Sequence, residues 1–353
     1  MSSTWRCATE QKKLQWLRKA GVACLLLAAT AVGSPAQTFR TLVSFNGSDG
    51  AFPYLGSLVQ DKDGNFYGTT EEGSANAYYG TVFKVTREGT LTTLYSFCSQ
   101  SGCPDGANPW AGLVPGADGK FYGTTVYGGA YGHGTVFEIT REGTLTTLHS
   151  FDYTDGTIPC APLIRATDGN FYGTTWAGGA NGYPYGYGTV FKISREGRLT
   201  TLHSFDYTDG ASPLAGLVPG ADGNFYGTTE RGGAYGYGAV FKITREGTLT
   251  TLHSFDDTDG AFPWAGLVLG ADGNFYGTTV SGGAYDDGTV FKISREGTLT
   301  TLHSFDITDG AKPYAPLIQA TDGKFYGTTN KGGVVYLGTV FSLTVGRDEW
   351  RHE

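Results

Sequence analysis

One short string recurs six times along the chain and limits the folds that the chain can adopt. The string Phe-Tyr-Gly-Thr-Thr begins at Phe66, Phe121, Phe171, Phe225, Phe275 and Phe325, so successive copies lie 55, 50, 54, 50 and 50 residues apart. Repeats of this length are supersecondary units that stack on one another to bury their apolar faces. The repeats cover residues 38–346 without a linker. This continuity indicates one repeat-built domain and not several independent ones.

Each repeat has the pattern of four short strands joined by tight turns. In the second repeat, apolar residues 112–114 lead through an Asp-Gly turn to a strand over 121–125, and a strand over 135–140 leads through Arg-Glu-Gly to another over 144–151. Such turns between apolar runs are hairpin signals, and no window longer than a turn shows helical periodicity. Four-stranded units of this size form propeller blades. We therefore predict an all-β, six-bladed β-propeller with four antiparallel strands per blade.

The two ends of the repeat region predict how the propeller closes. Residues 38–45 resemble the fourth strand of a repeat, and residues 338–344 resemble a third strand that no fourth strand follows. We expect the N-terminal strand to complete the last sheet. This velcro closure removes an open sheet edge, which is a liability in any sheet.

Several longer strings also recur, among them Asp-Gly-Asn-Phe-Tyr-Gly-Thr-Thr, Gly-Thr-Val-Phe-Lys-Ile and Leu-His-Ser-Phe. On these strings the repeat resembles the GloVer tandem-repeat family of exported bacterial proteins. The resemblance extends over the whole chain after its first 36 residues. It implies a propeller-like fold and export, and it implies no particular activity. Proteins of this family often carry a C-terminal sorting anchor, and because residues 347–353 include no apolar tail, free secretion is expected.

The N-terminus has the features of a secretory signal. Two basic pairs, at 12–13 and 18–19, precede an apolar run over 20–32, and a small-residue cleavage site ends at Ala36. The run of 13 residues is shorter than the ~20 that a membrane-spanning helix needs. The predicted organisation is a signal peptide over 1–36, a propeller over 37–346 and a short tail over 347–353. We expect a secreted or periplasmic protein without a membrane span.

The charge of the chain excludes one class of partner. The formal net charge is −8, and removal of residues 1–36 would leave 20 basic and 32 acidic residues, a net charge of −12. Nucleic-acid binding needs a basic surface, which this chain lacks. A glycan or an extracellular protein is the expected partner, and the protein is expected to be a monomer. In an oxidising compartment Cys98 and Cys103 are expected to be joined, which leaves Cys160 over.

Sequence variation is concentrated in two kinds of loop. The 2–3 loop joins the second and third strands of a repeat, and the 4–1 loop joins the fourth strand to the first strand of the next repeat. In an antiparallel meander these loops lie at the same end of the sheet, which we call the loop end; the near-identical turns lie at the other, the turn end. Loops on a rigid scaffold usually carry binding residues. Candidate ligand-binding residues are Tyr54, Trp110, Trp264 and Tyr314, which follow the proline of the 4–1 loop, and Trp176, Tyr185 and Arg231 in the 2–3 loops.

Two interpretations of these aromatic residues remain open. Aromatic faces beside acids and amides suit stacking on sugar rings or contact with a peptide. Alternatively the aromatic side chains pack between blades, because Cys160 and Leu214 occupy the position that follows the proline in other repeats.

Acidic residues provide weak candidates for catalysis and for calcium binding. Glu71 and Glu230 hold the same place in the first and fourth repeats, and two carboxyls across a channel mouth suit glycoside chemistry; ordinary exposed acids are the alternative. Repeated loop aspartates provide calcium candidates, namely Asp206, Asp209, Asp256 and Asp259. Aspartates more commonly stabilise turns through their own backbone. No other cofactor is predicted.

A recurring histidine is assigned a structural role. His149, His203, His253 and His303 occupy the outermost strand of four repeats. In a six-bladed ring, neighbours at that radius lie roughly 20 Å apart, whereas metal–nitrogen bonds measure about 2 Å. We therefore assign these residues to packing. His133 stands alone in a 2–3 loop and is interpreted as a solvated loop residue.

The combined features favour a secreted binding scaffold that presents an aromatic and acidic loop face to a glycan or protein. One alternative is a carbohydrate-active hydrolase or lyase with its site at the channel mouth. Another is a structural repeat protein of the envelope or matrix. The near-identity of the repeats favours binding or structure over catalysis, because an enzyme tends to break symmetry at one point.

Overall fold

The computed structural model describes residues 40–54, 56–74, 78–182 and 184–346. The chain divides after Thr41 into two units, and the second unit, 42–353, contains all the strands of the described residues. The predicted signal peptide over 1–36 and the predicted tail over 347–353 lie outside the described residues.

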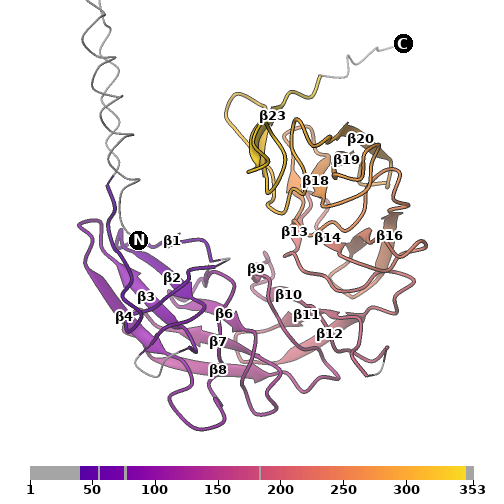
Figure 1. Cartoon of the computed structure of the whole chain (residues 1–353). Coiled ribbons are helices and arrows are strands. Elements are labelled where there is room, and N and C mark those ends of the chain that lie inside the picture. Colours follow the sequence, from indigo (N-terminus) through magenta and orange to yellow (C-terminus); the bar gives the residue numbers. More distant parts are fainter. Residues whose placement is uncertain (1–39, 55, 75–77, 183, 347–353) are drawn as a thin grey trace, which may run out of the picture. The chain divides into compact units, whose positions relative to one another are not determined.

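Six antiparallel sheets follow one another in chain order, which confirms the predicted six-bladed β-propeller (Figure 1). We number them blades one to six. The first strands are β1 (Val59–Gln60), β5 (Val114–Pro115), β9 (Ile164–Arg165), β13 (Val218–Pro219), β17 (Val268–Leu269) and β21 (Ile318–Gln319). The second strands are β2 (Phe66–Thr70), β6 (Phe121–Thr125), β10 (Phe171–Thr175), β14 (Phe225–Thr229), β18 (Phe275–Thr279) and β22 (Phe325–Thr329). The third strands are β3 (Thr81–Val85), β7 (Thr135–Ile139), β11 (Thr189–Ile193), β15 (Ala239–Ile243), β19 (Thr289–Ile293) and β23 (Thr339–Leu343). The fourth strands are β4 (Leu91–Ser96), β8 (Leu145–Ser150), β12 (Leu199–Ser204), β16 (Leu249–Ser254) and β20 (Leu299–Ser304).

The second strand shows why its sequence recurs. Gly173 of β10 pairs with Phe191 of β11, and a Cβ atom on Gly173 would lie 2.6 Å from Cζ of the Phe191 ring. A side chain is therefore excluded at this position. Thr175 and Thr189 are fully buried, and their hydroxyl oxygens lie 2.9 Å apart. This hydrogen bond satisfies two polar groups that would otherwise be costly to bury.

The tyrosine of the recurring string connects each sheet to its first turn. Tyr172 has a fully buried ring, and its hydroxyl donates to Oδ2 of Asp168 at 2.7 Å. Oδ1 of Asp168 accepts the backbone N–H of Asn170 at 3.0 Å, which stabilises the Asp-Gly-Asn turn. The same hydroxyl–aspartate bond occurs in all six blades.

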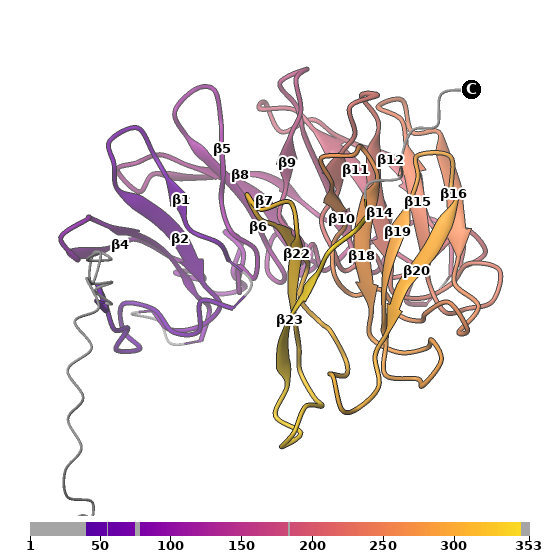
Figure 2. The ribbon, with the colours of Figure 1, turned by 90° about the horizontal axis from the view of Figure 1, so that it is seen from above.

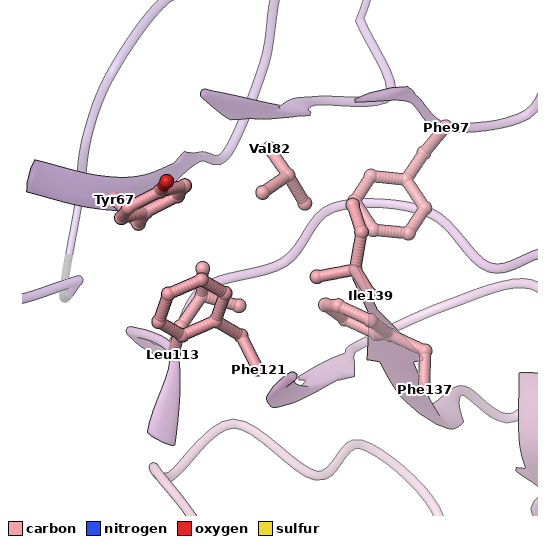
Figure 3. Packing of buried hydrophobic residues seen from close by; sticks show 7 residues of the cluster. All are labelled: Tyr67, Val82, Phe97, Leu113, Phe121, Phe137 and Ile139. Carbon is pink, nitrogen blue, oxygen red and sulfur yellow. The ribbon is translucent and has the colours of Figure 1, made fainter. Parts of the chain in front are cut away.

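The hydrophobic core lies between consecutive blades. Five clusters of buried side chains each draw on two neighbouring sheets. In the first cluster, shown in Figure 3, Tyr67 of blade one packs on Phe121 of blade two with ring centroids 4.4 Å apart. Phe97, which follows β4, packs edge-on against Phe137 at 5.2 Å. The sheets of blades four and five stand side by side in Figure 2. A cluster of the same kind lies between them, with Tyr226 of blade four and Phe275 of blade five among its members.

One part of the prediction differs from the structure. The last sheet contains only β21, β22 and β23, and residues 40–45, the described part of the expected closing strand, form no strand. Phe45 instead packs edge-on against Phe83 of blade one, with ring centroids 5.1 Å apart. The carbonyl oxygen of Leu42 lies close to Gly89 of blade one. The carbonyl oxygen of Leu94 lies close to Gly143 of blade two in the same way. Residues 40–45 therefore pack on blade one and form no backbone hydrogen bonds with β23.

Candidate functional site

The variable loops lie together at one end of the sheets, as predicted. In every blade an isolated antiparallel bridge joins the 4–1 loop to the following 2–3 loop. The bridged pairs are Ala51 and Glu72, Ala107 and Tyr127, Thr157 and Ala177, Ala211 and Arg231, Ala261 and Ser281, and Ala311 and Lys331. Each bridge fixes the register of two loops whose sequences differ from blade to blade. The bridge is therefore common to all six blades, whereas the lengths and side chains of the loops differ. The threonines that flank the 2–3 loop are 10 residues apart in blade two and 14 residues apart in blade three.

The residue before the loop proline has a positive φ in all six blades. These residues are Phe52, Asn108, Ile158, Ser212, Phe262 and Lys312. For a β-branched residue such as Ile158, with φ of 59°, this conformation is strained. Two backbone hydrogen bonds hold it, because its N–H donates to the carbonyl of His133 at 3.2 Å and its carbonyl accepts the N–H of Trp176 at 3.0 Å. One strained residue thus connects the 2–3 loops of blades two and three.

Between these two blades the loops enclose a hollow of about 320 Å³. Aromatic side chains form most of its wall, and they come from both 2–3 loops and from the 4–1 loop between them. The wall includes Tyr127, His133, Tyr153, Ile158, Trp176 and Tyr185. Tyr185 is 79% exposed and Tyr127 47% exposed, so the hollow opens to solvent. Ligand pockets are typically concave, mostly apolar and lined by aromatic residues with a few polar groups.

The polar groups of the hollow lie together on one side. Nδ1 of His133 lies 3.3 Å from the hydroxyl of Thr157, and that hydroxyl also donates to the His133 carbonyl. The imidazole ring packs edge-on against Tyr153 at 5.5 Å. The Tyr153 hydroxyl donates to the carbonyl of Pro184 in the facing loop. These contacts fix the aromatic side chains in place and leave hydrogen-bonding groups on one wall of the hollow.

The structure distributes the predicted ligand-binding residues over three places. Trp176 and Tyr185 line the same hollow. Tyr54 and Trp110 pack edge-on at 5.8 Å, across blades one and two. Trp264 and Tyr314 pack at 4.8 Å, across blades five and six, and each remains more than one-third exposed. The aromatic residues after the proline therefore pack between blades while part of their surface faces solvent.

Arg231, the remaining candidate, belongs to a cluster around Glu230. Glu230 is only 6% exposed. Its Oε1 accepts from Nε of Arg231 at 3.2 Å, and its Oε2 accepts a long hydrogen bond from the indole N–H of Trp176 at 3.5 Å.

Cys160, the cysteine left over from the disulfide, is also buried. Burial raises the pKa of its thiol to about 12, so this thiol is protonated at neutral pH.

The two catalytic candidates have separate surroundings. Burial raises the pKa of the Glu71 carboxyl, and the negative charge of Glu72 raises it further. Glu230 binds Arg231 and Trp176 with its two oxygens. Among the residues that the structure describes, no hydrogen bond or ion pair joins Glu71 to Glu230. A hydrolase with this pair as acid and base stays a prediction.

The aspartates considered for calcium are occupied by hydrogen bonds of their own loops. Oδ1 of Asp206 accepts from the backbone and hydroxyl of Thr208, at 2.9 and 2.7 Å. Oδ2 of Asp209 lies 2.6 Å from Nε2 of His203. Asp256 and Asp259 repeat this arrangement with Thr258 and His253. Within the described ranges, no group of three or more His, Cys, Asp and Glu side chains is arranged to hold a metal ion.

Two further sequence-based predictions concern the wider chain. Cys98 and Cys103 form a disulfide in the loop after β4. In the part of the chain that the structure describes, no helix is long and apolar enough to cross a membrane.

Sequence reasoning missed most of the residues that line the hollow. Tyr127 and Tyr153 were not singled out, and His133 was interpreted as a solvated loop residue. A usable signal was the alignment of the 2–3 loops from their C-terminal ends, because His133 precedes Gly134 as Tyr187 precedes Gly188 and Tyr237 precedes Gly238. That alignment places His133 at a position that tyrosine occupies in blades one, three and four, and that Asp287 and Leu337 occupy in blades five and six.

The fold and the loop end define a class of protein, a β-propeller built from near-identical repeats with a variable loop face. Within that class, a family model described as the Gloeobacter/Verrucomicrobia repeat matches residues 31–218 and 180–351. The chain belongs to this family.

Other comparisons relate the chain to distant proteins. A search of curated proteins finds no match. A putative 6-phosphogluconolactonase from Bacteroides uniformis is 18% identical, with 82% of this chain and 84% of that chain covered and a TM-score of 0.49. A luciferin-regenerating enzyme is 14% identical, with coverage of 84% and 92% and a TM-score of 0.46. A gluconolactonase from Xanthomonas campestris is 12% identical, with coverage of 84% and 88% and a TM-score of 0.44.

Proposed function

We propose that this protein is an exported binding protein that holds a glycan at its loop end, in the hollow between blades two and three. The observation that carries the proposal is the composition of the hollow wall. Tyr127, Tyr153, Trp176 and Tyr185 provide aromatic faces, and His133 with Thr157 provides hydrogen-bonding groups beside them. A sugar ring has an apolar C–H face and a rim of hydroxyls, so it matches both parts of the wall.

The scaffold supports this role because it holds the wall rigid. Trp176 is fixed through its backbone to Ile158, and its indole N–H is bound to Glu230. Tyr153 is bound to the facing loop through its hydroxyl. Aromatic groups that are already ordered lose little conformational freedom when a ligand binds. Binding without catalysis also agrees with the occupied carboxylate oxygens of Glu230.

A glycan array read for both binding and product formation tests the proposal. We expect binding of at least one glycan without product, and we expect Trp176→Ala to abolish it. Tyr285→Ala is the matched control, because Tyr285 is a loop tyrosine of blade five that is 63% exposed and lies outside the hollow.

Three outcomes would contradict the proposal. Normal glycan binding by Trp176→Ala would remove the hollow as the site. Absence of any bound glycan, with capture of peptides instead, would favour a protein ligand. Product formation by the parent protein that Glu71→Gln or Glu230→Gln abolishes would favour the hydrolase or lyase hypothesis.

A further inference from the structure

A buried carboxylate connects the wall of the hollow to a cationic group on the next blade. Glu230 belongs to the 2–3 loop of blade four and is 6% exposed. An isolated carboxylate is costly to bury, so its two partners determine why it is there. Trp176 of blade three donates to one oxygen, and Arg231 donates through Nε to the other. The carboxylate therefore fixes an indole ring and a guanidinium group next to each other.

The guanidinium group of Arg231 is presented to solvent with most of its donors available. The side chain is 61% exposed, and the backbone on either side is held by the bridge to Ala211. In the described part of the chain, the two terminal amino groups of Arg231 make no hydrogen bond or ion pair. A guanidinium has five N–H donors in a planar fork that matches a carboxylate, and here Nε alone is used. The two terminal amino groups of Arg231 therefore remain available as a pair of donors beside the indole ring of Trp176.

A tryptophan in one 2–3 loop and a carboxylate followed by a basic residue in the next occur together only between blades three and four. The first two residues of the 2–3 loops are Glu71-Glu72, Val126-Tyr127, Trp176-Ala177, Glu230-Arg231, Val280-Ser281 and Asn330-Lys331. A basic residue follows a carboxylate in blade four alone, and blade three is the one that provides a tryptophan. Lys331 of blade six holds the position of Arg231 without the carboxylate before it. Lys331 is therefore the natural control for charge without the cluster.

We propose that Trp176 and Arg231 form a subsite for an acidic sugar, a uronate residue of the bound glycan, with Glu230 as the positioning residue. The proposal rests on the proposed function, because it names the class of glycan that the hollow takes. The sugar ring stacks on the indole, and its carboxylate accepts two hydrogen bonds from the terminal amino groups of Arg231. The protein as a whole is acidic, so general attraction of anions does not provide the preference, and the fork must provide it locally.

The test compares acids with their own esters. Tetrasaccharides of galacturonate and of mannuronate are titrated calorimetrically, each as the free acid and as the methyl ester, which keeps the rings and removes the charge. We expect one of the acids to bind about tenfold more tightly than its ester. Arg231→Ala should abolish this difference and leave the affinity for the ester unchanged. Lys331→Ala should leave the difference intact.

The outcomes separate this inference from the proposed function. Ester binding equal to or tighter than acid binding would overturn the acidic-sugar subsite, and so would an equal loss in Lys331→Ala. In either case, dependence of ester binding on Trp176 would leave the proposed function standing. Binding of no tetrasaccharide would overturn the acidic-sugar subsite, and the glycan array would then decide the proposed function. A tetraglutamate peptide that binds more tightly than either acid would overturn the subsite in favour of an acidic protein ligand.

The positioning role of Glu230 has its own measurement. Glu230→Gln keeps the size of the side chain but cannot hold the indole and the guanidinium with a charged carboxylate. We expect the acid-over-ester preference to fall several-fold and tryptophan emission to shift. The shift should be absent when Glu230→Gln is introduced into Trp176→Phe. If Glu230→Gln keeps the full preference and the parent emission, Glu230 does not position these residues.

Discussion

Tyrosine has opposite roles at the two ends of the blades. At the turn end, the ring of Tyr172 is fully buried and its hydroxyl is bound to Asp168, and five other blades repeat this bond. At the loop end, Tyr185 is 79% exposed and lines the hollow together with residues of blade two. The repeated sequence therefore marks what holds a blade together. The differences between repeats mark what can select a ligand.

The comparison extends to the backbone. The turn end has the same aspartate bonds in every blade, and the loop end has the same bridges in every blade. Each end thus contains a contact that every blade repeats. The loop end combines its repeated bridge with loops whose lengths and side chains vary, and this combination is what a binding scaffold requires.

The largest expected effect is on the core from which both ends extend. Phe191 is fully buried between blades two and three and packs edge-on against Phe151 at 5.3 Å. We expect Phe191→Ala to lower the free energy of unfolding by about 3–5 kcal/mol, because it leaves a cavity. Denaturant titration followed by circular dichroism measures the change. A loss below about 1 kcal/mol would show that neighbouring blades do not depend on this contact.

The next effect compares the same substitution at the two ends. Tyr172→Phe removes the hydroxyl that donates to Asp168, and we expect a loss of about 1 kcal/mol in the free energy of unfolding. Tyr285→Phe removes an exposed hydroxyl at the loop end, and we expect a change within about 0.5 kcal/mol. Equal effects of the two variants would contradict the division of roles between the ends.

The fold could be predicted from the sequence because its determinants are local and repeated. The strand expected over 121–125 is observed as Phe121–Thr125, and the strand expected over 135–140 as Thr135–Ile139. The first strand of the second blade, expected within 112–114, is observed as Val114–Pro115, and Leu113 before it is buried in the core between blades one and two. The expected closing strand is not formed; Phe45 packs on Phe83 of blade one, and the last sheet ends at β23.

The candidate site could be predicted only in part. Trp176 and Tyr185 were identified because aromatic residues stand out in a glycine-rich loop. Their meeting with Tyr127 and His133 of the previous blade depends on the bridge register and on the positive φ of Ile158. Neither property is visible in residue types, because glycine or asparagine would be expected where the chain has isoleucine. The link from Glu230 to Trp176 likewise joins side chains 54 residues apart.

A smaller effect, on acid stability, should be shared by both ends. Burial alone would raise the pKa of Asp168, but hydrogen bonds from Asn170 and Tyr172 outweigh it and lower the pKa. The hydroxyl of Thr208 lowers the pKa of Asp206 at the loop end. A carboxyl whose pKa is lower in the folded state stabilises the protein above its unfolded pKa of about 3.9 and loses this contribution as the pH falls through the folded value. The free energy of unfolding should therefore decrease below about pH 4.

Substitution of each aspartate tests this assignment separately. Asp168→Asn and Asp206→Asn should each reduce the free energy of unfolding at pH 7 by about 1 kcal/mol, and each should make the decrease below about pH 4 less steep. Denaturant titrations between pH 2.5 and pH 7 measure both quantities. An unchanged slope in both variants would assign acid unfolding to other carboxyls.

The smallest expected effect on stability is at the rim of the hollow. Tyr185 is bound to the scaffold through its backbone, where its N–H donates to Gly182 and its carbonyl accepts from Gly178. Its side chain is largely exposed, so Tyr185→Ala should change the free energy of unfolding by less than about 0.5 kcal/mol. The same variant should weaken glycan binding several-fold, because it removes one aromatic face of the wall. A residue whose loss affects binding without affecting stability has the properties that the loop end requires, whereas a parallel loss of both would place Tyr185 with the buried tyrosines of the turn end.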